Sequence, residues 1–285
     1  MRRLTRRGFT LVELLIAIVI FGIVSTAIYG LLVRTQRLSR TQAERSIMQS
    51  NIRTGIGLVT SELRELNANA LLADIYAMSA TAIEYKGMRG LGFVCDIDAG
   101  YVRVPRAVWV GFRDPVATRD RVMLFVENDP DLASDDGWIE RAITGVTSES
   151  CSAGGAGVRL DIAASIPTDT LAMMTLGSPV RTFERMQIGQ MTSDGETWLG
   201  ARSISGGETT LQPVLGPLTP SGVTFSYWTQ VAGTSVEALL PLQVRTIRLV
   251  LRGITENIVA AGAGTVAWQR ASDSLVTDIR LRNAP

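Results

Sequence analysis

The sequence has no histidine, two cysteines and a formal net charge of +1. Without histidine, Ser-His and Cys-His catalysis and zinc-histidine sites are excluded, so the most common acid–base and zinc chemistry is missing. A charge balance this close to zero gives no overall field that would attract nucleic acid or acidic substrates. There is also no G-x-S-x-G nucleophile motif, no phosphate-binding loop and no metal-ligand cysteine pair. We therefore expect no enzyme, no catalytic residue, no cofactor and no nucleic-acid partner.

Charge is nearly missing from residues 9–33, an apolar run whose single charged residue is Glu13. An apolar stretch of about 18 or more residues can cross a bilayer as a helix. Four arginines precede the run with no acidic residue among them: Arg2, Arg3, Arg6 and Arg7. By the positive-inside rule this end stays in the cytoplasm, and the chain beyond about Arg34 lies in a bacterial periplasm. We expect a single-pass protein of the bacterial inner membrane with a periplasmic head.

The two cysteines suit that compartment. Cys95 and Cys151 both lie well downstream of the apolar run. Disulfides persist in oxidising compartments such as the periplasm, so a bond between these residues would fit the expected location. Two unpaired thiols are the alternative.

Glu13 is unusual because a charge at the centre of a membrane helix costs about 2.5–3.5 kcal/mol. Such a residue often marks function, although one near the interface can instead reach water. Its neighbours are similar to a known signal. With the basic residues before it, the stretch at 8–14, Gly-Phe-Thr-Leu-Val-Glu-Leu, resembles the type III signal sequence of type IV pilins and type II secretion pseudopilins.

The resemblance implies a filament subunit that is processed before it assembles. In this family a prepilin peptidase cuts after the glycine and methylates the new amino terminus, which here places the cut between Gly8 and Phe9. Glu13 would then be the fifth mature residue. The implied partners are the prepilin peptidase, an inner-membrane assembly platform and other pilins or pseudopilins, with which the subunit would be extracted into a periplasmic or surface filament.

The resemblance also implies a role for Glu13. Cleavage converts the amide of Phe9 into a positively charged α-amine, and N-methylation keeps that charge. In a bundle of staggered parallel helices, a neighbour's amine can lie beside Glu13. We expect the carboxylate to lack a partner in lipid and to gain one in the filament, where a low dielectric strengthens the attraction. Glu13 would thus favour assembly and set its register.

Two alternatives to a filament subunit stay open. Residues 5–11 also resemble a twin-arginine export motif, and residues 25–27, Ser-Thr-Ala, could serve as a cleavage site. However, the hydrophobic part of a secretory signal spans about 7–15 residues, and this run is far longer. The second alternative is a membrane-anchored periplasmic binding module or enzyme that never polymerises.

The sequence predicts an α+β fold, in which a long N-terminal helix, membrane-spanning in its first half, packs on a large antiparallel β head, as in pilins. Apolar residues recur at steps of three and four in the second half of this helix, at Met48, Ile52, Ile56, Val59, Leu63 and Leu66. We expect this stripe to pack on the protein's own sheet. The expected divisions are a cleaved leader at 1–8, a membrane and polymerisation helix at 9–33, an amphipathic periplasmic half at 34–66 and a β-rich head at 67–285.

The head has the texture of an antiparallel β domain, because short runs rich in Val, Ile and aromatic residues alternate with Gly, Pro and Asp clusters. The predicted strands are 81–86, 91–97, 101–104, 107–112, 121–127, 138–144, 157–163, 180–189, 222–229, 243–252, 264–270 and 275–282. Residues 67–82 are predicted as a small-residue transition with room for a short helix. Residues 127–137, 148–157 and 200–222 are predicted as loops.

One predicted loop is crowded with carboxylates: Asp129, Asp131, Asp135 and Asp136. Loop carboxylates are the ligands that calcium prefers, but the spacing does not follow an EF-hand. A solvated turn is the simpler interpretation, since aspartate bonds to its own backbone in turns. We predict no metal, and a calcium site built from these four residues is the alternative.

The end of the chain extends the resemblance. Segments 244–252 and 274–283 resemble the C-terminal strands of the larger minor pilins and pseudopilins. The nearest likeness is to the J-type minor pseudopilin of type II secretion and the W-type minor pilin of type IV pili. This likeness implies a position at or near the filament tip, whereas pilus and secretion machine stay equally open.

Overall fold

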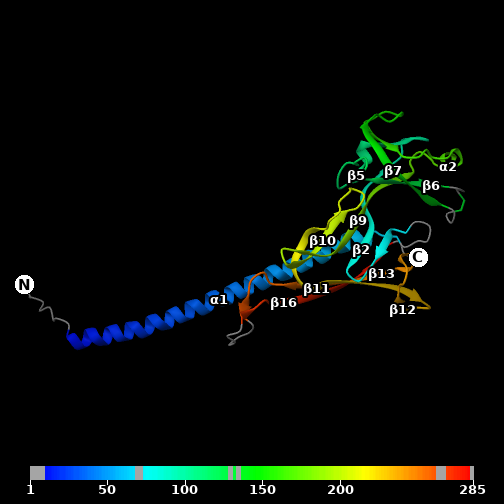
Figure 1. Ribbon diagram of the computed structural model, residues 1–285. Coiled ribbons are helices and arrows are strands. Elements are labelled where there is room, and N and C mark those ends of the chain that lie inside the picture. The colour runs from blue at the N-terminus through cyan, green and yellow to red at the C-terminus, as the bar shows by residue number, and fades with distance from the viewer. Residues whose placement is uncertain (1–9, 68–72, 128–130, 133–135, 261–267, 283–285) are drawn as a thin grey trace, which may run out of the picture. The chain divides into compact units, whose positions relative to one another are not determined.

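The computed structural model describes residues 10–67, 73–127, 131–132, 136–260 and 268–282. The chain forms two compact units, each described here by itself. The first comprises Met1–Gln49 and Thr255–Ala271, and the second comprises Ser50–Ile254 and Ser272–Pro285. The predicted α+β class is confirmed, because one long N-terminal helix is followed by a large antiparallel sheet (Figure 1).

The N-terminal helix α1 runs without a break from Leu11 to Arg64 (Figure 1). It contains no proline, and Gly22 and Gly30 both lie inside helical turns. Each glycine costs about 1 kcal/mol relative to alanine, and the helix continues through both. Within the described residues, α1 is the one helix long and apolar enough to cross a membrane. The helix predicted over 9–66 is therefore confirmed between residues 11 and 64.

In the second unit, the end of α1 packs on the sheet through one face. The buried members of the predicted stripe in this unit are Ile52, Val59, Leu63 and Leu66, and Met48, which belongs to the first unit, is buried as well. Ile56, which was expected to be buried, is only half-buried. The neighbouring Gly55 is buried instead. A Cβ added to Gly55 would lie 2.6 Å from Cδ2 of Leu215. The helix thus comes closest to the sheet where it has no side chain, one residue before the predicted contact.

Gly55→Leu is expected to lower the free energy of unfolding by about 1–3 kcal/mol, because the new side chain must displace Leu215 and Leu251 from a filled core. Gly57 is the matched control, since it is exposed on the same helix and nothing lies within 4 Å of a Cβ added there. Gly57→Leu should raise the free energy of unfolding by about 0.5–1 kcal/mol through helix propensity. Urea unfolding of the full-length protein in detergent, followed by circular dichroism, measures both. Equal effects of the two substitutions would contradict the close approach at Gly55.

In the described residues beyond α1 there are strands of 2 to 20 residues and three short helices. The strands of the large sheet are β1 (Ile75–Met78), β2 (Ala82–Phe93), β3 (Asp96–Asp98), β4 (Tyr101–Pro105), β5 (Val110–Gly111), β6 (Arg121–Val126), β7 (Gly137–Ser148), β8 (Gly157–Ile162), β9 (Pro179–Ser193), β10 (Glu196–Ser203), β11 (Gln212–Val231), β12 (Thr234–Glu237), β13 (Thr246–Ile254) and β16 (Ser272–Arg280). The short helices are η1 (Arg106–Val108), α2 (Thr168–Ala172) and η2 (Pro241–Gln243).

Strand β9 organises the large sheet. Along one edge it pairs with β2, and along the other it pairs first with β6 and then with β10. From β10 the sheet continues through β11 and β13 to β16, and from β6 it continues through β7, β8 and β4 to β3. Every pairing is antiparallel. Two groups of strands therefore extend from one shared pair, β2 and β9 (Figure 1).

Each group of strands contributes to an apolar core. One core lies where residues 50–64 of α1 meet β11 and β13, and it includes Leu249 and Leu251, both fully buried. The other is formed mainly by β4, β6 and β8, with fully buried valines such as Val102 and Val122. Alternation of buried and exposed residues along β13 is what a strand with one covered face requires.

Two predictions about irregular segments are wrong. The predicted transition at 67–82 contains β1, which pairs with β2. The predicted loop at 200–222 contains the end of β10 and the first half of β11. Pro213, Pro217 and Pro220 suggested a loop, because proline cannot donate to a strand ladder. The strand accommodates them because its register with β10 shifts twice and its pairing with β13 passes from Leu218 directly to Val223.

The first unit contains a strand pair of its own. Strand β14 (Val259–Ala260) pairs antiparallel with β15 (Trp268–Gln269), and Ala260 lies opposite Trp268. A backbone hydrogen bond joins the segment before β14 to the segment after β15, since the Thr255 N–H donates to the Ala271 carbonyl at 2.8 Å. The predicted strand at 264–270 is confirmed for the two residues of β15 that the structure describes.

Candidate functional site

The start of α1 is where the structure places Glu13, while Gly8, Phe9 and the four leader arginines lie outside the described residues. The Thr10 backbone N–H donates to Glu13 Oε2 at 2.9 Å, and the Thr10 hydroxyl donates to the same oxygen at 3.0 Å. In return, the Glu13 N–H donates to Thr10 Oγ1 at 3.2 Å. This reciprocal pair is a capping box, in which each side chain satisfies a backbone donor that the helix start leaves free.

The capping box corrects one expectation from the sequence. Glu13 was expected to lack any partner before assembly, but it already bonds to Thr10 within its own chain. The signal was present, because Thr-Leu-Val-Glu at 10–13 has the S/T-x-x-E pattern of a capping box. The carboxylate also lies where the partial positive charge of the helix start favours an anion. Glu13 therefore enters any assembly step already held in one place.

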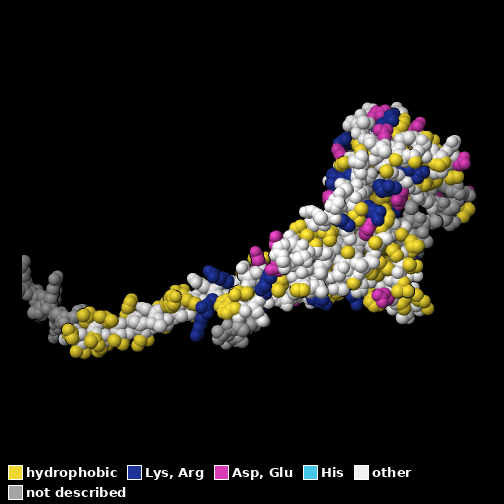
Figure 2. Space-filling view, viewed as in Figure 1, with side chains coloured by type: hydrophobic (Ala, Val, Ile, Leu, Met, Phe, Trp, Pro, Cys, Tyr) yellow, Lys and Arg dark blue, Asp and Glu magenta, His cyan; other side chains and the backbone are white. Residues whose placement is uncertain are grey.

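Behind Glu13, the surface of α1 is apolar and uncovered within the described residues. Side chains are exposed all around the helix, for example Leu11 at 80%, Phe21 at 73% and Leu31 at 64%. Figure 2 shows hydrophobic side chains over this part of α1, ending at a group of arginines farther along. A helix that is apolar on every side is suited to lipid or to close packing against other helices.

The two cysteines of the sequence form a disulfide. Cys95 and Cys151 are joined with their Cα atoms 5.9 Å apart, across a sequence separation of 56 residues. Asp96 beside Cys95 accepts the backbone N–H of Ser152 at 2.7 Å. Hydrogen bonds from Ser152 and from Arg103 lower the pKa of Asp96. Cys95, Asp96 and Cys151 lie close enough together to hold a metal ion, but sulfurs bonded to each other cannot act as thiolate ligands.

The second unit contains a buried ion cluster around Lys86, the only lysine of the sequence. Lys86 is 2% exposed, and its Nζ lies 3.2 Å from Asp74 Oδ1 and forms an ion pair with Glu140. Its ammonium group also lies 5.4 Å from the ring centre of Phe183. Burial raises the pKa of Asp74, and the charge of Lys86 opposes that rise. A buried charge is tolerated here because opposite charges surround it.

A second buried carboxylate, Glu184, is held by arginines. Arg119 Nε lies 2.9 Å from Glu184 Oε1, and Arg113 forms an ion pair with the same oxygen. Arg113 also makes two bonds of 2.6 Å to Asp120, whose side chain is fully buried. Burial would raise the pKa of Glu184, but hydrogen bonds from Arg119 and Arg113 outweigh it and lower that pKa. Each carboxylate here is saturated by arginine, which favours a structural ion network over acid–base chemistry.

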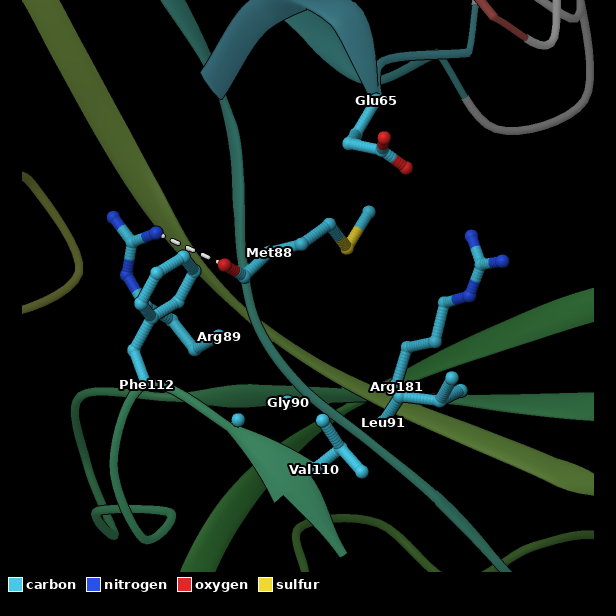
Figure 3. A pocket seen from close by; sticks show the side chains of 9 residues that line it. Glu65, Met88, Arg89, Gly90, Leu91, Val110, Phe112 and Arg181 are labelled. Atoms are coloured by element: carbon cyan, nitrogen blue, oxygen red, sulfur yellow. Dashed lines mark hydrogen bonds between the residues drawn. The ribbon is translucent and has the colours of Figure 1, made fainter. Parts of the chain in front are cut away.

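The head has an apolar cavity of about 400 Å³ between β2 and β5 (Figure 3). Its lining includes Met88, Leu91, Val110, Phe112, Arg181 and Glu65. Phe112 is 85% exposed, and Figure 3 shows Met88 reaching between Glu65 and Arg181. The guanidinium of Arg181 lies 5.3 Å from the ring centre of Trp138. The cavity can hold an apolar group and offers Arg181 to an anion.

The carboxylate-rich loop is only partly described. Asp131 is exposed and Asp136 is half-buried at the start of β7, whereas Asp129 and Asp135 lie outside the described residues. Among the residues that the structure describes, the group at Cys95 is the one set of three or more potential ligand residues that lie close together. The prediction of no metal at this loop, and the alternative of a calcium site, therefore both stay untested.

Comparison with known proteins bears on the N-terminal segment. Residues 3–29 match the family model described as the prokaryotic N-terminal methylation motif. No curated protein and no solved structure matches the chain. The motif implies processing by a prepilin peptidase and assembly with other pilins, and the apolar helix that starts within it suggests anchoring in the inner membrane, as for prepilins. Proteins of this type are typically structural and not enzymes. The motif and the long apolar helix together support a pilin or pseudopilin of the type IV pilin-like family.

Proposed function

We propose that this chain is a minor pilin or pseudopilin of a type IV pilus or a type II secretion filament, of the kind represented by J-type pseudopilins and W-type pilins. A prepilin peptidase would remove a leader at 1–8 by cutting between Gly8 and Phe9. Residues 9–33 would serve as membrane and polymerisation helix, and residues 34–66 as its periplasmic half. Residues 67–285 would form the head.

The proposal rests chiefly on the match of residues 3–29 to the methylation motif. Inside this segment, Glu13 is fixed at the helix start by Thr10, and the helix surface behind it is apolar and exposed. A subunit that must leave lipid for a bundle of like helices needs such a surface, because both surroundings accept it. The disulfide between Cys95 and Cys151 supports a head on the oxidising side of the membrane.

The head supports a position at or near the filament tip. It carries a sheet of 14 strands, on which two apolar cores are built. We expect copies of a head of this size to crowd one another if they followed one another along a shaft. At an end, one face of the head stays free. The choice between pilus and secretion filament would follow from the partner subunits that co-purify with it.

Mass spectrometry of the protein from its native membrane tests the processing step. We expect a mature chain that begins at N-methylated Phe9, and we expect Gly8→Leu to keep residues 1–8 attached. Gly30→Leu is the control for an added side chain in the same segment, since nothing lies within 4 Å of a Cβ there, and it should be processed normally. A native chain that retains its first eight residues would contradict the proposal, and a start near Ile28 would indicate export by the twin-arginine route instead.

A membrane-anchored binding module that does not polymerise is the second candidate, and the cavity between β2 and β5 favours it. Its volume falls within the range of about 300–1,000 Å³ that is common for small-molecule sites. Substitutions of Phe9 and Glu13 discriminate between the two functions. A filament subunit should lose processing or incorporation, whereas a simple anchor should be unaffected by either change.

A further inference from the structure

The strand pair β14–β15 is attached to α1 just beyond its apolar part. The Asn257 side-chain amide donates to Glu44 Oε1 at 2.8 Å, and the Asn257 backbone N–H donates to Glu44 Oε2 at 3.3 Å. Arg37 lies over the Trp268 ring, 5.6 Å from its centre. All of these residues belong to the first unit. Residues 255–260 and 268–271 are therefore held beside residues 37–44 of the helix.

This attachment lies at the depth of lipid headgroups if residues 9–33 cross the membrane, as proposed above. With a rise of about 1.5 Å per residue, Arg37 lies about 6 Å beyond Val33, the last residue of the apolar run. The headgroup layer on each side of a bilayer is about 5–8 Å thick. Arg34 and Arg37 thus fall within that layer, and the longer reach of an arginine side chain brings Arg40 within range of it.

The charges at this level are mostly positive. Arg34, Arg37 and Arg40 are exposed, and none has a carboxylate partner within the described part of the chain. The acidic residues of segments 34–49 and 255–260 are Glu44, which accepts both bonds from Asn257, and the exposed Glu256. Arginines close to a membrane helix are more frequent on the cytoplasmic side, so a cluster on the opposite side is unusual. Phosphate groups of phospholipids are the anions present at that depth.

Apolar and aromatic side chains accompany the arginines. Ile258, directly before β14, is 60% exposed, and Trp268 in β15 is 46% exposed, although either position could have carried a polar residue. Tryptophan gathers at membrane interfaces, where its ring lies among acyl carbonyls and its N–H meets water. The neighbouring cavity, of about 620 Å³, is lined by Arg37, Arg40, Glu44 and Ile258 and by Trp268.

We propose that Arg34, Arg37, Arg40, Ile258 and Trp268 form a phospholipid-binding surface, here called the exit surface, where α1 leaves the outer side of the inner membrane. The arginines bind lipid phosphates, and Ile258 and Trp268 enter the interface beside them. The strand pair thereby attaches a segment more than 200 residues downstream to the same depth of membrane as the end of the anchor. The proposal of an exit surface depends on the proposed membrane insertion of residues 9–33. It adds a second contact with lipid, which an anchor helix alone does not need.

Tryptophan quenching by brominated lipids tests the exit surface. Full-length protein is reconstituted in phosphatidylcholine vesicles, with and without phosphatidylglycerol, whose acyl chains carry bromine near the carbonyl end. The fluorescence of wild type minus that of Trp268→Phe isolates Trp268 from the other tryptophans. We expect strong quenching of this difference, and stronger quenching with phosphatidylglycerol, because each arginine near an anionic surface contributes about a fivefold preference. Arg37→Gln should reduce the gain from phosphatidylglycerol, and the triple substitution Arg34→Gln, Arg37→Gln and Arg40→Gln should abolish it.

Arg53→Gln is the matched control, since Arg53 is exposed on the same helix about 24 Å beyond Arg37. It should leave the quenching of Trp268 unchanged. Vesicle flotation after alkaline washing reports insertion of the helix separately. Failure to float would overturn the proposed membrane insertion, whereas a protein that floats but whose Trp268 is not quenched would overturn the exit surface alone. Quenching that is equal with and without phosphatidylglycerol would overturn the charge contact of the arginines with anionic headgroups and would leave the arginines free for an acidic partner protein.

Discussion

Glu13→Gln is expected to exclude the subunit from filaments although the variant keeps its helix cap. Glutamine at the third helical position still bonds back to the backbone of Thr10, so the capping box survives. What disappears is the negative charge that the amine of a neighbouring Phe9 would meet. If Glu13 acts in assembly through its charge, Gln and Ala at this position should both reduce incorporation severely. The amount of subunit in sheared filaments, relative to the amount in the membrane, measures the effect.

Thr10→Ala is the matched control for the cap. It removes the hydroxyl that donates to Glu13 and accepts from its N–H, and it leaves the carboxylate in place. Losing a cap costs about 0.5–2 kcal/mol of helix stability, which a membrane-embedded helix should tolerate. We therefore expect Thr10→Ala to be incorporated nearly as well as wild type. Normal incorporation of Glu13→Gln together with poor incorporation of Thr10→Ala would show that Glu13 acts as a cap and not as a charge.

The same pairing can be trapped chemically. Lys86 is the only lysine of the sequence and is 2% exposed, so the terminal amine of Phe9 is the accessible amine of a folded mature subunit. A carbodiimide that joins amines to carboxylates without a spacer should link Phe9 of one subunit to an acidic residue of the next. We expect Glu13, or its equivalent in a neighbouring pilin, at that link. A link only to carboxylates of the head would contradict the proposed pairing.

What the sequence could predict depended on how local the signal was. The helix and its apolar run were predictable because the pattern repeats within a few residues, and the capping box of Thr10 and Glu13 was readable for the same reason. The contact at Gly55 was missed because a pattern of apolar side chains does not reveal a position where the helix packs closely through a residue without a side chain. The first half of strand β11 was missed because its prolines lie where pairing is irregular, and that irregularity is set by other strands.

The buried charge of Lys86 could not be predicted at all. Its two partners lie outside β2, Asp74 before β1 and Glu140 in β7. The pairing of β2 with β1 brings Asp74 close, and the order β2, β9, β6, β7 in the sheet brings Glu140 close. A lone lysine among apolar and glycine residues of a strand looks like a solvated side chain. Its burial is a property of the sheet, and its consequences appear only when the charge is removed.

Lys86→Met is expected to lower the free energy of unfolding by about 3–5 kcal/mol at neutral pH. Methionine fills a similar volume, so the loss is electrostatic: Asp74, 2% exposed, and Glu140 keep their charges without a cation between them. A loss of this size is a large share of the roughly 5–15 kcal/mol that stabilises a typical domain. Urea unfolding of the full-length protein in detergent, followed by tryptophan fluorescence, measures it.

The pH dependence identifies the cause. Burial raises the pKa of Asp74 and Lys86 opposes that rise, so Lys86→Met should raise the pKa of Asp74 further. For a carboxyl group whose folded pKa lies above its unfolded pKa, the penalty is complete above the folded value and disappears as pH falls towards the unfolded one. The destabilisation by Lys86→Met should therefore shrink as pH is lowered from about 8 towards about 4.

Adding Asp74→Asn should restore part of the stability at the higher pH and flatten this trend. A penalty that grows on acidification, or one that Asp74→Asn does not relieve, would show that Lys86 stabilises the sheet through the packing of its aliphatic chain and not through its charge.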